Sequence, residues 1–339
     1  MLFLPAFLAH RLSILFFIVT LPAIFSSPQQ KSPATPPVAI RVTVDRVSVG
    51  VVVTDSAGRL VEGLRREDFQ IFDNGAEQPL TGFSAVDEPA QVLVLIEAGP
   101  AVYLLQGGHL QSARELLNGL SAGDRIALVK YADIPEPVLD FTADKQAAAT
   151  ALENLRFNIG FGSLNLSASL AKVMDWLDKL SGKKTVVLLS TGLDTSSPGN
   201  SSSLLQRLRI GGVRVLAVSL TGELRSPPPA ATRKKSSPTA TSSKAAWTAQ
   251  QFATSDTLLK QIAESTGGRA YFPNTASDFN SVYAEIARIV RHEYSLAFAP
   301  PARDNSVHAI EVRVRANTPV SAAAPLRVDY RQAYLAPAP

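Results

Sequence analysis

The sequence predicts an α/β protein in which a doubly wound, mostly parallel sheet is inserted between two β segments. Between residues 91 and 292, apolar strand-like runs alternate with amphipathic helix-like stretches, which is typical of a parallel sheet covered by helices. Residues 38–90 and 293–335 instead show short runs rich in β-branched and aromatic residues. Neither flank is large enough for a core of its own, so we expect the two to pack together as a small β-sandwich-like domain.

The composition narrows the class of protein. The chain has 339 residues, 46% hydrophobic and 18% charged, which indicates a globular protein of about two domains. It has no cysteine, so disulfides, thiolate nucleophiles and cysteine-ligated metal centres are excluded. Its four histidines are scattered without the spacing of metal ligands.

The N-terminal residues 1–27 resemble an export signal. His10 and Arg11 precede an apolar run from Leu12 to Phe25, and two small serines follow. That run is shorter than the ~20 residues that span a membrane, so we expect a signal peptide, with an uncleaved anchor as the alternative. Residues 28–37 are rich in Pro, Ser and Gln and predict a disordered linker. The protein is therefore expected to be exported, as a periplasmic, secreted or cell-envelope protein.

The N-terminal β segment is expected to contain strands at 40–44, 47–53, 60–61, 69–72 and 80–83. Alternating or continuous β-branched residues predict these strands, and the Asp55–Gly58 and Asn74–Gly75 turn sequences separate them. In the C-terminal segment, the same reasoning predicts strands at 294–298, 309–314 and 326–330.

The α/β domain spans 91–292. Strands are expected at 92–96, 125–131, 138–141, 184–190, 213–220 and 269–272. Among them, the apolar runs at 92–96 and 184–190 predict buried strands. Apolar residues at helical spacing predict helices at 110–120, 145–155, 166–180, 204–210, 256–265 and 276–292.

Residues 225–250 interrupt this rhythm and predict a disordered insertion loop. The loop begins with three prolines at 227–229 and continues with Ser, Thr, Ala and Lys without periodicity. It carries five basic residues and no acid, whereas the whole chain has a net charge of +4. The rest of the chain is therefore close to neutral, which argues against nucleic acid as a partner.

Several separated segments, in order, resemble a von Willebrand factor type A domain, whose fold is doubly wound and Rossmann-like. They are the buried run at 92–96, Gly-Ser-Leu-Asn-Leu at 162–166, Ser-Thr-Gly-Leu-Asp at 190–194 and Ile-Ala-Glu-Ser-Thr-Gly-Gly-Arg at 262–269. The flanking Gly-Leu-Arg-Arg-Glu-Asp-Phe at 63–69, Phe-Asp-Asn-Gly at 72–75 and Val-Asp-Tyr-Arg at 328–331 look like the bacterial exported "VWFA-related" proteins.

The resemblance implies an interaction module with a metal-ion-dependent adhesion site at the carboxyl ends of the strands. In that family, an Asp-x-Ser-x-Ser motif, a Thr and an Asp hold magnesium, and the open position of the ion takes a carboxylate of the partner. The matching positions here, with the nearby Asp194 added, are Glu97, Gly99, Ala101, Ser163, Thr191 and Asp194. Both serines of the first motif and the third-loop carboxylate are lost, so we expect a degenerate site without metal. If magnesium or calcium binds weakly, its ligands are Glu97, Ser163, Thr191 and Asp194.

These expectations leave three classes of function. The favoured one is an exported, non-enzymatic protein–protein interaction module, an adhesion or scaffold protein. The alternative is a metal-dependent adhesion protein with an altered ligand set for magnesium or calcium. An enzyme is disfavoured, because the sequence has no nucleophile elbow, histidine-metal cluster or nucleotide loop, and Glu67, Asp68 and Asp73 are expected to be solvated. We expect no contact with a membrane except through the N-terminal segment.

Overall fold

The computed structural model describes residues 46–85, 88–99, 102, 109–155, 163–195, 201–225, 249–315 and 325–339. All of them belong to one compact unit, Val44–Pro339. The expected signal segment, linker and strand at 40–44, and most of the expected 225–250 loop, lie outside the described residues.

A six-stranded sheet forms the centre of the α/β part, in the order β10-β9-β8-β5-β6-β7. Neighbouring strands are parallel except for β7, which is antiparallel to β6. The strands are β5 (Ala90–Glu97), β6 (Arg125–Tyr131), β7 (Pro135–Thr142), β8 (Lys183–Ser190), β9 (Arg214–Ser219) and β10 (Ala270–Tyr271).

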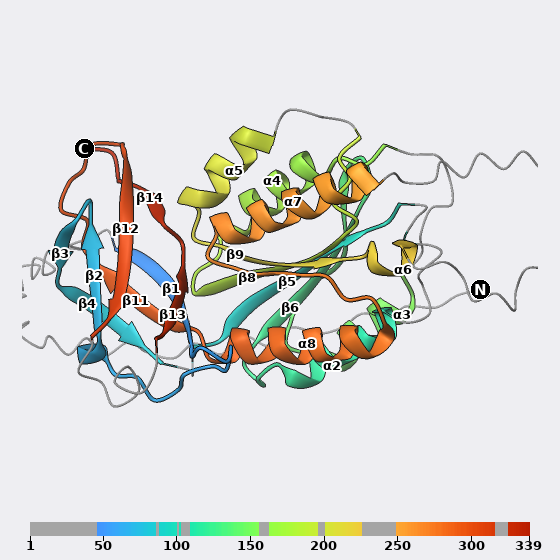
Figure 1. The fold of residues 1–339 in the computed structure, drawn as a ribbon, viewed down its shortest axis with the longest axis horizontal. Coiled ribbons are helices and arrows are strands. Elements are labelled where there is room, and N and C mark those ends of the chain that lie inside the picture. Colours follow the sequence, from blue (N-terminus) through green and yellow to red (C-terminus); the bar gives the residue numbers. More distant parts are fainter. Residues whose placement is uncertain are drawn as a thin grey trace, which may run out of the picture. The chain divides into compact units, whose positions relative to one another are not determined.

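Helices cover both faces of this sheet (Figure 1). Helices α2, α3 and α8 lie on one face, and α4, α5 and α7 lie on the other. The helices are α2 (His109–Gly119), α3 (Lys145–Glu153), α4 (Leu166–Leu177), α5 (Ser201–Ile210), α6 (Gly222–Arg225), α7 (Ala249–Ser265) and α8 (Ala276–Arg291).

Strand β5 shows why the sheet needs helices on both faces. Val92, Val94 and Ile96 belong to the core cluster beneath α2 and α8, whereas Leu93 and Leu95 belong to the cluster beneath α4 and α7. Successive side chains of a strand point to opposite faces, so a continuously apolar strand can only be buried in the middle layer of three.

Two four-stranded antiparallel sheets form the β part, with orders β13-β1-β11-β4 and β14-β12-β2-β3. They enclose a core cluster to which both sheets contribute. Their elements are β1 (Val47–Thr54), the short 3-10 helix η1 (Arg66–Asp68), β2 (Phe69–Asp73), β3 (Ala76–Gln78), β4 (Leu80–Ser84), β11 (Tyr294–Phe298), β12 (Val307–Val314), β13 (Arg327–Tyr330) and β14 (Ala333–Leu335).

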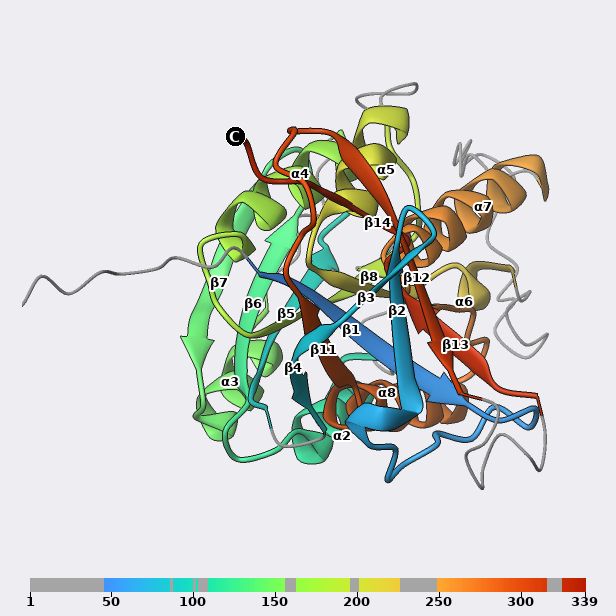
Figure 2. The same ribbon diagram turned by 90° about the vertical axis from the view of Figure 1, so that its left-hand side faces the viewer.

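Strands from the two ends of the chain pair directly with one another (Figure 2). Strand β1 lies between β11 and β13, with Val47 opposite Phe298, and β2 pairs with β12, with Ile71 opposite Val312. The predicted fold class, a doubly wound sheet inserted between β segments that form a sandwich, is confirmed.

Some elements differ from those expected. Helix α7 begins at Ala249, although we expected its first residues in the disordered loop and the helix only from Asp256. Its first buried residue is Ser255, so the first turns carry no apolar periodicity. Ala and Gln favour a helix there, and the half-buried Phe252 lies under the Arg225 guanidinium. Strands β3 and β14 were not expected, because each is a three-residue strand at the edge of its sheet.

Asp73 is buried, and the expectation that it is solvated is wrong. Its carboxylate accepts a hydrogen bond of 2.8 Å from the Tyr334 hydroxyl and lies 2.8 Å from Nδ1 of His308. Burial acts to lower the pKa of His308, but its hydrogen bonds to Asp73 and Asp304 outweigh burial and raise it. Strand β12 pairs with β2 on one side and with β14 on the other, and this pairing creates the polar cluster, which is not visible in the local sequence.

Arg214, the first residue of β9, joins the sandwich to the α/β part. Its buried guanidinium donates to Oε1 of Glu293 at 3.0 Å, to the carbonyl oxygen of Gly50 at 3.0 Å and to the carbonyl oxygen of Gly267. The amino ends of the central strands therefore face the sandwich, and the carboxyl ends point away from it (Figure 1).

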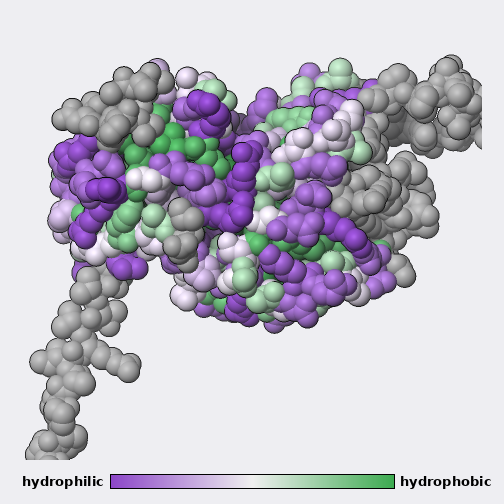
Figure 3. Space-filling model, turned by 90° about the horizontal axis from the view of Figure 1, so that it is seen from below, coloured by the Kyte–Doolittle hydropathy of each residue, from purple (hydrophilic) through white to green (hydrophobic). Residues whose placement is uncertain are grey.

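Hydrophilic residues cover much of the face seen from below, with hydrophobic residues in smaller patches between them (Figure 3). Most large apolar side chains instead belong to the three core clusters. Among the helices of the described chain, none is long and apolar enough to cross a bilayer.

Gly267, which follows α7, provides a test of the contact between the α/β part and the sandwich. Gly267 has φ +70°, and a Cβ there would lie 2.2 Å from the carbonyl carbon of Tyr330 in β13. Gly58 has φ +78°, but a Cβ there would meet nothing within 4 Å. We expect Gly58→Ala to lower the free energy of unfolding by about 1–2 kcal/mol, through the left-handed backbone alone. Gly267→Ala should lower it by a further ~1–3 kcal/mol through the clash with β13.

Urea denaturation of the two variants beside the unchanged protein measures both effects. Equal losses of stability for the two variants would contradict the tight contact between the end of α7 and β13.

Candidate functional site

Two of the expected site residues, Glu97 and Thr191, lie at the carboxyl edge of the central sheet. Glu97 is the last residue of β5, and Thr191 directly follows the last residue of the neighbouring strand β8. The chain proceeds from β5 to β6 on one side and from β8 to β9 on the other, so this is the topological switch point of the sheet. Open α/β sheets bind ligands at such a point.

The Glu97 carboxylate is fully buried, with 0% of the residue exposed. The Thr191 backbone N–H donates to its Oε2 at 2.7 Å, and the Thr191 hydroxyl lies 2.8 Å from both carboxylate oxygens. The hydroxyls of Ser190 and Tyr131 lie 3.0 and 3.3 Å from Oε2. The two strands that flank β5, namely β6 and β8, thus supply this carboxylate with hydrogen-bond donors from within the protein.

These contacts give the residues defined roles. The Thr191 hydroxyl donates its hydrogen bond to the Glu97 carboxylate, so it is not available to donate to a ligand. The Ser190 and Tyr131 hydroxyls are also bonded to each other at 2.7 Å. Burial raises the pKa of Glu97, and these hydrogen bonds act in the opposite direction. Burial, together with the nearby charge of Glu97, raises the pKa of Tyr131 well above its ordinary value, so Tyr131 stays a neutral hydroxyl.

The other expected site residues contact different groups. Ser163 is exposed, and its hydroxyl donates to Oδ1 of Asp133 at 3.1 Å. The Asp194 carboxylate accepts the Ser167 backbone N–H at 2.9 Å, in the first turn of α4. The structure thus brings Glu97 and Thr191 together and gives Ser163 and Asp194 other partners.

Gly99 lies close to Glu97 and to the buried Leu164. A Cβ on Gly99 would be 3.4 Å from Oε1 of Glu97 and 3.0 Å from Cδ2 of Leu164, so a larger residue here would crowd both side chains. Ala101, the remaining expected position, lies outside the described residues.

Three residues that contact the expected site residues, Ser190, Tyr131 and Asp133, were not predicted from the sequence. Ser190 and Tyr131 are polar residues that end apolar strands flanking β5, and this position was the signal that could have identified them. Asp133 follows β6 by two residues and had no comparable signal, because its contact with Ser163 depends on how two loops meet.

A groove of about 590 Å³ adjoins this edge between the segment after β8 and helix α7. Its walls include Leu193 and Asp194 on one side and Thr254, Leu258 and Gln261 on the other. The groove is thus lined by hydroxyl, amide and carboxylate groups together with two leucine side chains. This mixture suits an extended polar ligand or a protruding segment of a partner.

Comparisons with known proteins agree with this fold. Residues 110–286, just over half of the chain, match the von Willebrand factor type A domain. Among solved structures, a von Willebrand factor type A protein from Catenulispora acidiphila has 14% identity and a TM-score of 0.45, and the match covers 79% of this chain and 71% of that one. An aerotolerance-related membrane protein from Bacteroides fragilis has 13% identity and a TM-score of 0.44, with 59% and 98% covered. At these values neither structure supports an argument about function. No curated protein matches the chain.

The buried carboxylate predicts a pH dependence of stability. A carboxyl group whose pKa is raised by folding stabilises the folded state fully below its unfolded pKa, and this stabilisation is lost as the pH rises through the folded pKa. Glu97→Gln cannot titrate. We therefore expect the unchanged protein to lose stability relative to Glu97→Gln as the pH rises from the ordinary value of 4.5.

Urea denaturation of both proteins from about pH 4 to pH 8 measures this difference. Glu264→Gln, at an exposed position on α7, is the control and should follow the unchanged protein at every pH. A constant stability difference between Glu97→Gln and the unchanged protein would contradict the raised pKa.

Proposed function

Because the chain belongs to the von Willebrand factor type A domain family, we propose that it is an exported, non-enzymatic protein–protein interaction module that binds its partner without a metal ion. It would serve as an adhesion or scaffold protein. The apolar N-terminal run before a Pro-, Ser- and Gln-rich segment supports export.

The hydrogen bonding of Glu97 is the observation that carries the metal-free proposal. Magnesium requires several oxygen ligands whose lone pairs converge on the ion, and it retains water unless enough negative charge replaces that water. Here the buried carboxylate already accepts hydrogen bonds from Thr191 and Ser190. Among the described residues, no group of three or more His, Asp or Glu side chains is arranged to hold a metal ion. These residues do not fit a magnesium site.

The groove beside this edge is the surface we assign to the partner. It is reached from the same end of the sheet, and its wall from α7 exposes Thr254 and Gln261. Partner recognition through hydrogen bonds to these groups needs no metal-bound carboxylate. The same arrangement supports the proposal that the site is not enzymatic, since the buried Glu97 is withdrawn from any substrate in the groove.

Metal ions should have no effect on the stability of the protein. We expect the thermal unfolding midpoint to be the same in excess chelator and in millimolar magnesium, calcium or manganese, because a ligand raises the midpoint only if it binds the native state. Differential scanning calorimetry measures this. A rise with one of these ions that disappears in Glu97→Ala would refute the metal-free site and support the metal-dependent alternative.

A variant within the groove tests whether the partner binds there. We expect Thr254→Arg to abolish capture of the partner from a cell-envelope extract in the presence of chelator, because the larger charged side chain fills the groove. Thr150→Arg on α3 introduces the same change at an exposed helical position on the other face of the sheet and should leave capture unchanged. Quantitative mass spectrometry compares the three captured sets. If Thr254→Arg captures all the proteins that the unchanged protein captures, the groove is excluded as the binding surface.

A further inference from the structure

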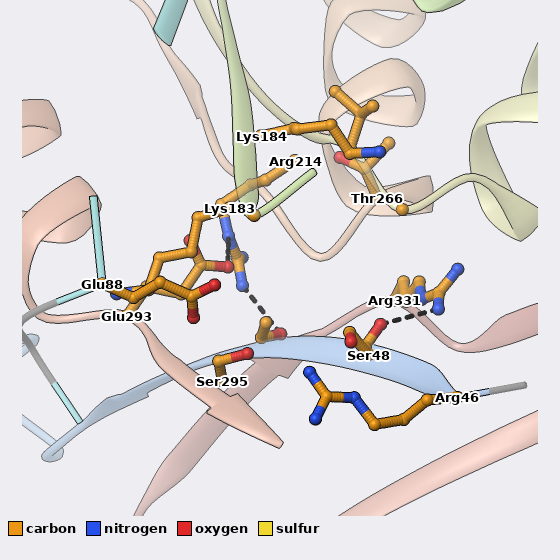
Figure 4. Close-up of a pocket in the computed structure, with 14 residues that line it drawn as sticks. Arg46, Ser48, Glu88, Lys183, Lys184, Arg214, Thr266, Glu293, Ser295 and Arg331 are labelled. Atoms are coloured by element: carbon orange, nitrogen blue, oxygen red, sulfur yellow. Dashed lines mark hydrogen bonds and ion pairs between the residues drawn. The ribbon is translucent and has the colours of Figure 1, made fainter. Parts of the chain in front are cut away.

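A second pocket lies at the opposite, amino edge of the central sheet, where the α/β part meets the sandwich (Figure 4). It has a volume of about 110 Å³, and both parts of the protein line it. We infer that this pocket binds one small tetrahedral oxyanion, a phosphate or sulfate group, held chiefly by Lys183 and Arg331.

Positive charge predominates in the pocket. Its lining includes five basic residues and two acidic ones, namely Arg46, Lys183, Lys184, Arg214 and Arg331 against Glu88 and Glu293. Arg214 and Glu293 neutralise each other in a buried ion pair of 3.0 Å. Four cations therefore remain with Glu88 as their only acidic counterpart among the described lining residues, which leaves room for an anion with more than one negative charge.

Lys183 is the strongest indication of a missing ligand. It is the first residue of β8, only 7% of it is exposed, and its Nζ has no hydrogen-bond partner within the described structure. A buried ammonium without a partner is costly, and such groups are normally paired with an anion or hydrogen-bonded. An oxyanion in the pocket would supply the missing acceptor.

Arg331 is held in place without being neutralised. Its Nη1 donates to the carbonyl oxygen of Ile210 at 3.0 Å and its Nη2 to the carbonyl oxygen of Ser48 at 2.7 Å, whereas its buried Nε has no partner in the described chain. Carbonyl oxygens orient the guanidinium but carry no full charge. Burial lowers the pKa of Arg331 to about 10, so it remains positively charged at neutral pH.

Lys184 adds a like charge to the same region. Burial lowers the pKa of Lys184, and the positive charge of Arg331 acts in the same direction, although Asp178 opposes both. A bound anion would relieve this repulsion. The pocket is too small for a nucleotide or a folded segment, and cations on several sides match the distributed charge of phosphate or sulfate better than the single charge of a carboxylate.

An oxyanion here would connect the two parts of the protein. Lys183 belongs to the central sheet, whereas Ser48 lies on β1 and Arg331 follows β13 in the sandwich. Ser48 and Ser295 also line the pocket from the sandwich side. Binding would stabilise the contact between the sandwich and the α/β part.

Thermal unfolding and isothermal titration calorimetry of the full chain test this inference. The probes are sodium phosphate and sodium sulfate, compared with sodium chloride at matched ionic strength. We expect phosphate or sulfate to raise the unfolding midpoint of the unchanged protein as its concentration passes the dissociation constant. Lys183→Met should weaken this binding by at least about tenfold, the effect of losing a charged hydrogen bond.

Two comparisons separate loss of binding from loss of folding. In chloride, Lys183→Met should unfold at the same temperature as the unchanged protein or higher, because it removes an unpaired buried charge. Lys172→Met, at an exposed position on α4, is the matched control and should retain the full response to phosphate. Arg331→Met should also lose the response.

The inference is overturned if neither phosphate nor sulfate shifts the unchanged protein, or if Lys183→Met responds as strongly as Lys172→Met. A further arm with glycerol 3-phosphate identifies the source of the group. Equal binding of this ester supports a phosphate carried on a larger molecule, and binding of the inorganic ions alone supports a free anion.

Discussion

The hydrogen bonds of the Arg214 guanidinium determine how the two parts of the protein fit together. One buried side chain bonds Glu293 at the start of the C-terminal segment, Gly50 in the N-terminal strand β1 and Gly267 at the end of α7. Removing one partner of a buried ion pair typically costs about 3–5 kcal/mol, because the other charge is then unpaired. Gly50 is required by the same contact, since a Cβ there would lie 1.8 Å from Oε1 of Glu293.

This junction gives the central sheet two unlike ends. At the amino end, cations from the sheet and the sandwich converge on a small pocket, and Lys183 there lacks a hydrogen-bond partner. At the carboxyl end, the buried carboxylate of Glu97 is supplied with donors by its neighbours. Glu97, the residue expected to attract a cation, thus has its hydrogen bonds supplied within the protein. Lys183, at the opposite edge, is a cation without a hydrogen-bond partner in the described structure.

Much of the fold could be predicted from the sequence, because continuous apolar runs such as 92–96 and 184–190 fit only buried parallel strands. The pairing of the two β segments followed from their size, since neither could bury a core alone. The start of α7 could not be predicted, because no residue before Ser255 is fully buried in it and its first turns show no apolar periodicity. The structure brings Glu97 and Thr191 together at one edge, whereas Ser163 bonds Asp133 and Asp194 bonds the backbone of Ser167 in α4. These contacts depend on how distant segments meet. The buried states of Asp73 and Lys183 likewise arise only when distant strands meet.

The pairing of β1 with β11 and β13 also has a kinetic consequence. Val47 lies opposite Phe298, so β1 gains its neighbours only after nearly the whole chain has been synthesised. Contacts between residues so far apart in sequence form slowly, whereas each strand of the central sheet pairs with partners much nearer along the chain. The inserted α/β part can therefore fold first, and by doing so it brings the two halves of the sandwich together. Until then β1 lacks β11 and β13, and β2 lacks β12, so during this interval the chain is most exposed to aggregation.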